Sequence, residues 1–439
     1  MIGLGATGFS CACYLEHLGV RVSVYDSQKE PPFANRLHRE KPSVVTHLGK
    51  LDKAEFTDAD VLVVSPGVSL THPSIVMARD AGVEIIGDIE LFARSAQRPI
   101  VGITGSNGKS TVTKLTETLF AAAGVSVLTG GNIGRPALDL LNEEEPDYYL
   151  LELSSFQLET TSSLSSEVAV ILNISPDHMD RYTDIDSYVA AKARITTLAN
   201  TIVLNRDDPK LAQLIETTRA PNVVTFGLNK PELEGDFGLV QRDSEDYLVH
   251  GDKVFLRAQD LKIEGRHNIS NVLAALAIVS TIVSGKTDVM ASAIRSFSGL
   301  PHRCEIIGDH RGVLWINDSK GTNVGATVAA LEGIGRPVVL IAGGQAKNAD
   351  FNPLARSAQR FARQVVLFGE DRQLIREYLS PSVSVTTVTT LEQAARLAAE
   401  WAQPGDAVLF SPACASFDMF DNFEHRGDSF REIVSGISQ

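Results

Sequence analysis

The chain has 439 residues, enough for about three domains of roughly 100 to 200 residues each. Its 44% hydrophobic and 21% charged residues are typical of a globular protein with several cores. The formal net charge of −14 argues against an extended basic surface, so we expect no nucleic-acid partner. Without a signal peptide or an apolar run of about 18 residues, the sequence predicts a cytoplasmic protein with no membrane span.

The first predicted domain, residues 1–87, opens on a glycine turn. Residues 3–8 fit G-x-G-x-x-G, and a strand over 20–25 ends at Asp26, placed for a ribose hydroxyl. This pattern indicates dinucleotide binding, although the same turn suits any diphosphate. Only two residues precede Gly3, too few for a central strand of about five residues. We therefore expect a truncated strand or a natural start further upstream.

The second predicted domain, residues 88–298, carries a glycine loop at 102–111, between an apolar strand and an amphipathic helix that closes at Gly124. Strand, glycine loop and helix are the setting of a phosphate site, where backbone N–H groups and Lys109 face the anion. A hydroxyl of Ser110 or Thr111 can hold Mg²⁺. Ile103 stands where the general pattern has glycine, so an ordinary turn carrying a lysine is the alternative.

Four further side chains of this domain can be interpreted from their positions in the sequence. Glu152 lies alone among apolar neighbours in a strand over 148–155, so we expect it to face a cation rather than water. His178 follows the strand over 168–174, where a metal ligand, a substrate contact or an ordinary loop histidine are all possible. Lys192 lies in a helical segment whose periodicity predicts exposure to solvent. Asn268 opens another helix and serves either as a cap or in the site.

The third predicted domain, residues 299–439, alternates strands and helices again. Strands over 313–316, 338–341, 365–368 and 407–410 each end in a cluster of glycine and polar residues. Such clusters are typical of the ligand-binding rim of a parallel sheet. We therefore predict an α/β protein of three domains: a Rossmann-like domain, a central sheet with a P-loop-type phosphate site and a second Rossmann-like domain.

Several long motifs resemble the Mur ligase family. They are residues 102–111, the run LELSSFQLE at 151–159, NISPDHMD at 173–180, 265–275, LPHRCE at 300–305 and NDSK at 317–320. The tail at 411–427 is similar to the branch of the family that adds D-glutamate. The likeness extends from Gly3 to about residue 430, nearly the whole chain.

The resemblance implies an ATP- and Mg²⁺-dependent ligase of cytoplasmic peptidoglycan precursor synthesis, a monomer on which cell shape and division depend. ATP would phosphorylate the carboxylate of UDP-N-acetylmuramoyl-L-alanine, and the amine of D-glutamate would attack the acyl phosphate. The first glycine turn would then hold the UDP pyrophosphate rather than NAD. A related ligase, such as a folylpolyglutamate synthase or one with L-glutamate specificity, and an NAD-dependent oxidoreductase are the remaining alternatives.

The resemblance also implies roles for individual residues. The catalytic residues would be Lys109, His178, Lys192 and Lys320. ATP would contact Gly105, Ser106, Asn107, Gly108, Lys109, Ser110, Thr111, Val112, Asn268, Asn271, Arg303 and Asp318, with the N–H groups from Ser106 to Val112 around the phosphates. The UDP-sugar would contact Thr7, Asp26, Ser27, Gly67, Asn132 and His178. D-Glutamate would contact Lys320, Thr322, Lys347, Ser416 and Phe423.

Magnesium would be held by Ser110, Glu152, His178 and Lys192, the last as a carbamate formed with CO₂. This implied role opposes the solvent exposure that periodicity predicts for Lys192. Gln28 stands where the family often has arginine near the uracil, so we expect that contact to be rebuilt. Residues 297–300 are the predicted hinge of a closing motion between the second and third domains.

Overall fold

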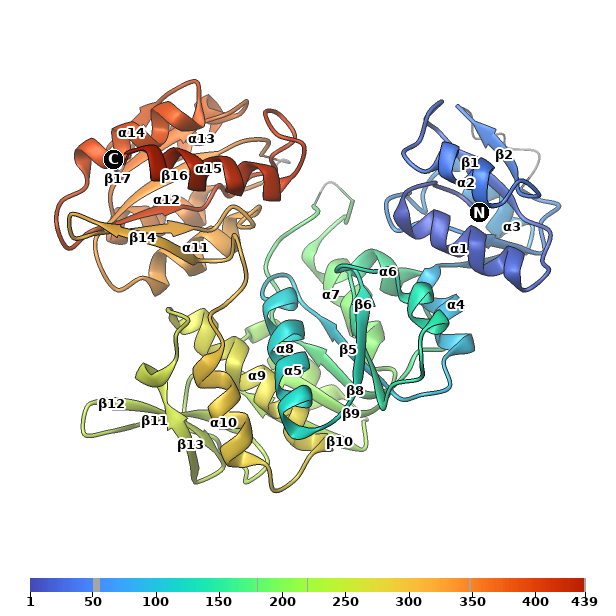
Figure 1. The fold of residues 1–439 in the computed structure, drawn as a ribbon, viewed down its shortest axis with the longest axis horizontal. Helices are drawn as coiled ribbons and strands as arrows, with labels where there is room; N and C mark the ends of the chain where they lie inside the picture. The colour runs from blue at the N-terminus through green and yellow to red at the C-terminus, as the bar shows by residue number, and fades with distance from the viewer. Residues whose placement is uncertain (50–55, 180, 219, 347–348, 438–439) are drawn as a thin grey trace.

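The computed structural model describes residues 1–49, 56–179, 181–218, 220–346 and 349–437. It has three α/β parts, each built around its own sheet (Figure 1). The predicted fold class is confirmed. In the described part of the chain, no helix has the length and apolar character needed to cross a membrane.

The first part is a parallel sheet whose central strand is reduced to one residue. Ile2 makes parallel bridges to Tyr25 and Val64, and so joins two separate strand pairs, β1 with β2 and β3 with β4. A short strand at this position agrees with both alternatives given for the start of the chain. The elements are β1 (Ser23–Asp26), β2 (Val45–Leu48), β3 (Val61–Val63), β4 (Glu84–Ile86), α1 (Ala6–His17), α2 (Ala34–Glu40) and α3 (Pro73–Asp80).

The central part is a nine-stranded sheet in the order β13-β12-β11-β10-β9-β8-β5-β7-β6. The strands from β10 to β6 pair in parallel, and β11 to β13 add an antiparallel extension at one edge. All five residues of β5 are buried, because helices cover both faces of the sheet there. The carboxyl end of β5 opens directly into the glycine loop, which β7 and β8 flank on either side.

The central elements occur where they were predicted, but two strands end earlier than expected. The strand predicted over 148–155 ends at Glu152, because Ser154 caps a short helix that begins at Ser155, and the strand predicted to reach 174 ends at Ile171. The strands are β5 (Ile100–Thr104), β6 (Val127–Gly131), β7 (Tyr148–Glu152), β8 (Ser165–Ile171), β9 (Leu198–Asn205), β10 (Asn222–Phe226), β11 (Phe237–Arg242), β12 (Glu245–His250) and β13 (Lys253–Arg257). The α-helices are α4 (Asp88–Ser95), α5 (Lys109–Ala123), α6 (Ser155–Glu159), α7 (Ile185–Ala193), α8 (Pro209–Thr217), α9 (Arg266–Ile282) and α10 (Thr287–Ser296). Short 3₁₀ turns are η1 (Ala137–Asn142), η2 (Arg194–Thr196) and η3 (Ala258–Asp260).

The last part is a six-stranded sheet in the order β14-β15-β19-β16-β17-β18, in which β14 alone runs antiparallel to its neighbour. Its strands are β14 (Glu305–His310), β15 (Val313–Asn317), β16 (Val338–Gly343), β17 (Ala362–Phe368), β18 (Val385–Thr387) and β19 (Ala407–Phe410). Its helices are α11 (Val324–Gly333), α12 (Asn352–Phe361), α13 (Arg372–Leu379), α14 (Leu391–Trp401) and α15 (Phe423–Ile437).

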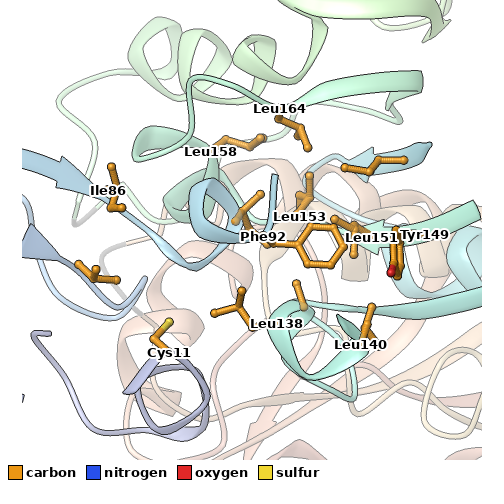
Figure 2. Packing of buried hydrophobic residues seen from close by; sticks show 14 of the residues in the cluster. Cys11, Ile86, Phe92, Leu138, Leu140, Tyr149, Leu151, Leu153, Leu158 and Leu164 are labelled. Carbon is orange, nitrogen blue, oxygen red and sulfur yellow. The ribbon is translucent and has the colours of Figure 1, made fainter. Parts of the chain in front are cut away.

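The hydrophobic clusters join the three parts unequally. One continuous cluster runs from α1 and the first sheet through α4 and η1 into β7, and Figure 2 shows Cys11, Phe92, Leu138 and Tyr149 in it. The last part has its own clusters on the two faces of its sheet. The first two parts are thus joined by a shared apolar core, and the third is not a member of it.

Candidate active site

The glycine loop turns from β5 into α5 through two glycines with positive φ, Gly105 at 153° and Gly108 at 82°. A Cβ on Gly108 would lie 2.5 Å from Oδ1 of Asn271, so only glycine allows α9 to approach the loop this closely. This contact brings Asn271, predicted to bind ATP, directly to the loop.

Three of the loop amides predicted to face phosphate donate within the protein instead. The N–H groups of Ser106 and Asn107 donate to the backbone and side-chain oxygens of Asn173, at 2.9 and 2.8 Å. Val112 is fully buried, and its N–H donates to the carbonyl of Gly108 at 2.9 Å. The amides of residues 108–111, at the N-terminus of α5, are the ones left in the position where helices bind anions.

Two lysines share one acceptor beneath the loop. The Nζ of Lys109 donates to the carbonyls of Gly105 and Ser106 at 2.8 and 3.0 Å, and the Nζ of Lys192 donates to Gly105 at 2.9 Å. Burial lowers the pKa of Lys109. Burial, and then the charge of Lys109, lower the pKa of Lys192 well below its usual value. Lys192 therefore loses its proton more readily than an exposed lysine does.

The solvent exposure predicted for Lys192 from periodicity is wrong, because its residue is only 1% exposed. Tyr188, Ala191 and Lys192 are three and four positions apart and form the buried face of α7. The Nζ of Lys192 also lies 4.5 Å from the centre of the Tyr188 ring. The spacing from Tyr188 is the sequence signal that could have placed this lysine inside.

Glu152, at the end of β7, is 2% exposed, as its apolar neighbours predicted. Its Oε1 accepts from the amide of Asn132 at 3.0 Å, and its Oε2 is buried with no hydrogen-bond partner among the described residues. A buried carboxylate oxygen left in this state is the position that a cation satisfies. This part of the site therefore fits Mg²⁺.

The other predicted metal ligands do not complete a metal site around Glu152 by themselves. The Oγ of Ser110 accepts from Nη2 of Arg303 at 2.6 Å, and His178 adopts a left-handed backbone with φ of 58°. No three His, Cys, Asp or Glu side chains within the described ranges gather closely enough to hold a metal. A cation at Glu152 therefore needs oxygens from other sources, such as hydroxyl groups, a carbamate or phosphates.

A cavity of about 490 Å³ adjoins the loop between the second and third parts. The predicted ATP contacts that line it are Asn107, Gly108, Thr111, Asn268, Asn271, Arg303 and Asp318. The cap alternative for Asn268 is wrong: its amide donates to the carbonyl of Glu264 at 2.8 Å, and no side chain caps α9. Sequence motifs far apart in the chain thus meet around one nucleotide-sized space.

Arg303 and Asp318 bring the third part to this cavity. Arg303 stands between two residues with positive φ, His302 at 61° and Cys304 at 46°, so a strained turn carries it. Asp318 accepts from the N–H of Cys304 at 3.1 Å and from Ser411 at 2.6 Å. Burial raises the pKa of Asp318 to about 6.

The predicted amino-acid contacts begin at the same cavity. The Nζ of Lys320 lies 4.0 Å from the centre of the Phe423 ring. Burial and the charges of Arg303 and Lys109 lower the pKa of Lys320 to about 8. Ser416 is buried, and Lys347 lies outside the described residues.

Arg426 is a structural member of this region that the sequence interpretation missed. It is 1% exposed, and its guanidinium donates to Oγ and the carbonyl of Ser319 at 3.1 and 2.7 Å and to the carbonyl of Cys414 at 3.2 Å. It therefore ties the loop carrying Lys320 to the tail segment. An arginine inside the long tail motif was the available signal.

A second cavity, of about 440 Å³, lies at the glycine turn of the first part. The predicted UDP-sugar contacts that line it are Thr7, Asp26, Ser27, Gly67 and Asn132, and Gln28 lines it as well. The carboxylate of Asp26 accepts from the N–H groups of Leu4 at 2.7 Å and Gln28 at 2.8 Å. Asp26 thus shapes the turn itself. His178 is not in the lining of this cavity.

Two polar residues that the sequence interpretation did not single out connect the parts. Arg181 donates to the carbonyls of Pro66 and Val68 at 2.7 and 3.0 Å, across to the first part. The side-chain amide of Asn323, in the third part, donates to Asn107 and Asp177 of the central part at 3.1 and 3.0 Å.

Three family models match successive segments of the chain. Residues 1–87 match the Mur ligase MurD-like N-terminal domain, 103–279 the Mur ligase middle domain, and 302–414 the Mur ligase glutamate ligase domain. Among curated relatives, the UDP-N-acetylmuramoylalanine–D-glutamate ligase of Nitrosococcus oceani is 49% identical over 100% of this chain and 96% of its own. The ligase of the same name from Pseudomonas aeruginosa is 47% identical over 100% of this chain and 98% of its own.

The fold is shared with solved structures of low sequence identity. The MurF ligase from Thermotoga maritima, solved in complex with ADP, superposes with a TM-score of 0.61. It covers 87% of this chain and 97% of its own at 17% identity. At that identity the likeness shows a shared fold and no more.

Proposed function

The chain belongs to the Mur ligase family, and from that premise we propose how it joins D-glutamate to UDP-N-acetylmuramoyl-L-alanine with ATP. Full-length relatives at 46 to 49% identity carry the name of this D-glutamate ligase of peptidoglycan synthesis. The observation that carries the mechanism is the nucleotide-sized cavity whose lining joins Gly108 and Thr111 of the glycine loop to Lys320 of the third part.

The chemistry of the reaction suits the charges around this cavity. A carboxylate is a poor electrophile, and phosphorylation gives it a good leaving group. The N-terminus of α5 and the buried ammonium of Lys109 stabilise the negative charge of the transferring phosphoryl group. The first domain presents the substrate carboxylate, held by its UDP at the turn of residues 3–8. Lys320 holds a carboxylate of D-glutamate so that the amine faces the acyl phosphate.

Magnesium would be held by Glu152, Ser110, His178 and carbamylated Lys192, and when bound it supplies charge neutralisation at the phosphates. Lys192 is suited to carbamylation because its lowered pKa favours loss of its proton. The lone pair of the free amine forms the N–C bond to CO₂, one C=O electron pair moves to oxygen, and the nitrogen releases a proton. Lys192→Ala should abolish turnover, with partial recovery in small carboxylic acids. Unchanged rates in this variant and after bicarbonate depletion would refute the carbamate.

Phosphate release with UDP-N-acetylmuramoyl-L-alanine and each glutamate enantiomer tests the proposal. We expect turnover that needs both substrates and prefers D-glutamate. Equal or greater turnover with L-glutamate would reassign the amino acid, and ATP hydrolysis that ignores both substrates would overturn the ligase assignment.

We further propose that the protein acts as a monomer in the cytoplasm, where nucleotide-linked precursors of the cell wall are made. All the residues predicted to bind the substrates, ATP and magnesium belong to one chain, which supports a monomer. Light scattering at micromolar concentration, with and without nucleotide, measures the molecular mass. A stable dimer under both conditions would contradict this part of the proposal.

A further inference from the structure

We propose that Asn323 is a positioning residue through which the third domain is set in register with the phosphate loop. The proposal rests on the ligase activity above and goes beyond it, because none of the assigned ATP, metal or amino-acid contacts includes this side chain. Asn323 is 9% exposed and stands directly before α11.

Both polar atoms of the Asn323 side chain form hydrogen bonds: Oδ1 within the third domain and Nδ2 with the central domain. Its Oδ1 accepts from the N–H of Ala326 at 2.8 Å and caps α11 within the third domain. Its Nδ2 donates to Oδ1 of Asn107 at 3.1 Å and to Oδ2 of Asp177 at 3.0 Å. The cap fixes the orientation of the amide, so the two outward bonds report the position of α11 relative to the central domain.

The two acceptors belong to the segments that carry the chemistry. Asn107 is a residue of the phosphate loop, and its own Nδ2 donates to Oγ of Ser175 at 3.1 Å. Asp177 directly precedes His178. One amide from the third domain therefore contacts both the loop that faces phosphate and the segment that carries the predicted metal ligand.

A second observation supports close apposition at this point. A Cβ on Gly325, in the first turn of α11, would lie 2.8 Å from Oγ of Ser175 in the central domain. Position 325 has no room for a side chain while the amide of Asn323 is engaged. Register between the domains is thus set by a polar contact and a steric contact two residues apart.

Substitutions of Asn323 can separate its positioning role from its capping role. Serine and aspartate cap helices as well as asparagine does, but neither carries the outward N–H donors. Asn323→Ser therefore removes the link and keeps the cap. Asn323→Asp also keeps the cap, and places a carboxylate against Asp177, which makes the contact repulsive.

The experiment compares kcat, KM and Tm of the purified full-length protein and its variants. We expect Asn323→Ser to lower kcat about tenfold, the loss of one charge-assisted hydrogen bond, and Asn323→Asp to lower it further. Both should keep the native Tm and the native affinity for UDP-N-acetylmuramoyl-L-alanine measured by calorimetry, because the first two domains hold that substrate. The double variant Asp177→Asn/Asn323→Asp restores the hydrogen bond with reversed polarity and should recover kcat relative to Asn323→Asp.

Thr390→Ala is the matched control, because Thr390 caps α14 of the same domain through the N–H of Gln393 and forms no side-chain hydrogen bond to another domain among the described residues. It should lower Tm without changing kcat. The proposal is overturned if Asn323→Ser and Asn323→Asp keep kcat within twofold. It is equally overturned if they lose Tm as Thr390→Ala does while the double variant recovers nothing. Absence of ligation by the native protein would instead refute the proposed function.

Discussion

At the scale of single residues, the protein keeps carboxylates in positions that water does not reach. Asp88 is 2% exposed at the start of α4 and accepts from the side-chain amide of Gln157 at 2.9 Å. Glu152 is equally buried but lies beside the buried lysines. Asp88 has a neutral partner, whereas Glu152 faces Lys109 and Lys192. We therefore expect pH to act on Asp88 and magnesium to act on Glu152.

Asp88→Asn should flatten the decline of stability with rising pH. Burial raises the pKa of Asp88 from 3.8 to about 6, so the folded protein binds this proton more tightly than the unfolded chain. The resulting stabilisation is complete below about pH 4 and is lost as pH rises through about 6, by up to about 3 kcal/mol. Tm measured at pH 5 and pH 8 should differ less in the variant. An identical difference in both proteins would contradict the prediction.

Glu152→Gln should remove the effect of magnesium on thermal stability in the presence of nucleotide. The amide cannot satisfy a divalent cation as a carboxylate does, so the extra rise in Tm that Mg²⁺ adds to ADP should disappear. Glu145→Gln, at a carboxylate that is 57% exposed, is the control and should keep that rise. The same Mg²⁺ effect in both variants would remove Glu152 from the metal site.

At the scale of elements, the glycine turn of the first domain depends on how closely α1 packs. A Cβ on Gly8 would lie 1.9 Å from the carbonyl oxygen of Gly3, a backbone atom that cannot rotate away. Gly5, in the same turn, has nothing within 4 Å of its Cβ position. Packing therefore requires glycine at position 8 of this motif and leaves room for a side chain at position 5.

Gly8→Ala should displace α1 and weaken binding of the UDP-sugar about tenfold or more, because the cavity is built on this turn. ADP affinity should stay unchanged, since the phosphate loop belongs to another sheet. Calorimetric titration with each ligand measures both. Gly5→Ala is the control for stability and should shift Tm little, whereas equal Tm shifts in the two variants would refute the packing argument.

At the scale of the whole molecule, the domains are joined by different forces. The first and central domains share an apolar cluster, which shifts only at a high cost in buried area. The third domain meets the phosphate loop through polar contacts of Arg303 and Asn323. The third domain is therefore the one suited to move, with residues 297–300 as its predicted hinge.

Arg181→Ala should uncouple the first domain from the segment that carries His178. Arg181 holds the two carbonyls on either side of Gly67, and its guanidinium stacks 4.0 Å from the centre of the Phe156 ring. We expect KM for the UDP-sugar to rise about tenfold while KM for ATP changes less than twofold. Steady-state kinetics measure both constants. A rise in KM for ATP alone would show that Arg181 acts on the other ligand.

The fold class could be predicted from sequence because strands and helices alternate with clear periods and glycines end the strands. The loop at 102–111 and the buried Glu152 also follow from local pattern. Hydrophobicity alone misplaced Lys192, because lysine is normally exposed. Its spacing from Tyr188 was the one sequence signal, and the hydrogen bond to Gly105 is a tertiary contact that local pattern does not contain. Arg181 and Asn323 are polar residues whose partners are distant in sequence, so a linear pattern contains no record of them. For Arg426 the only signal was its place in the tail motif.

The contacts that complete the phosphate loop also set an order of events during synthesis. Asn107 meets Asn323 across 216 positions, and Ser110 meets Arg303 across 193. A ribosome adds about 5 to 20 residues per second, so the loop is exposed for roughly ten to forty seconds before its partners emerge. A nascent chain therefore has a phosphate-binding loop before Arg303 and Asn323 can contact it. We expect turnover of nucleotide to begin only when the last domain has folded.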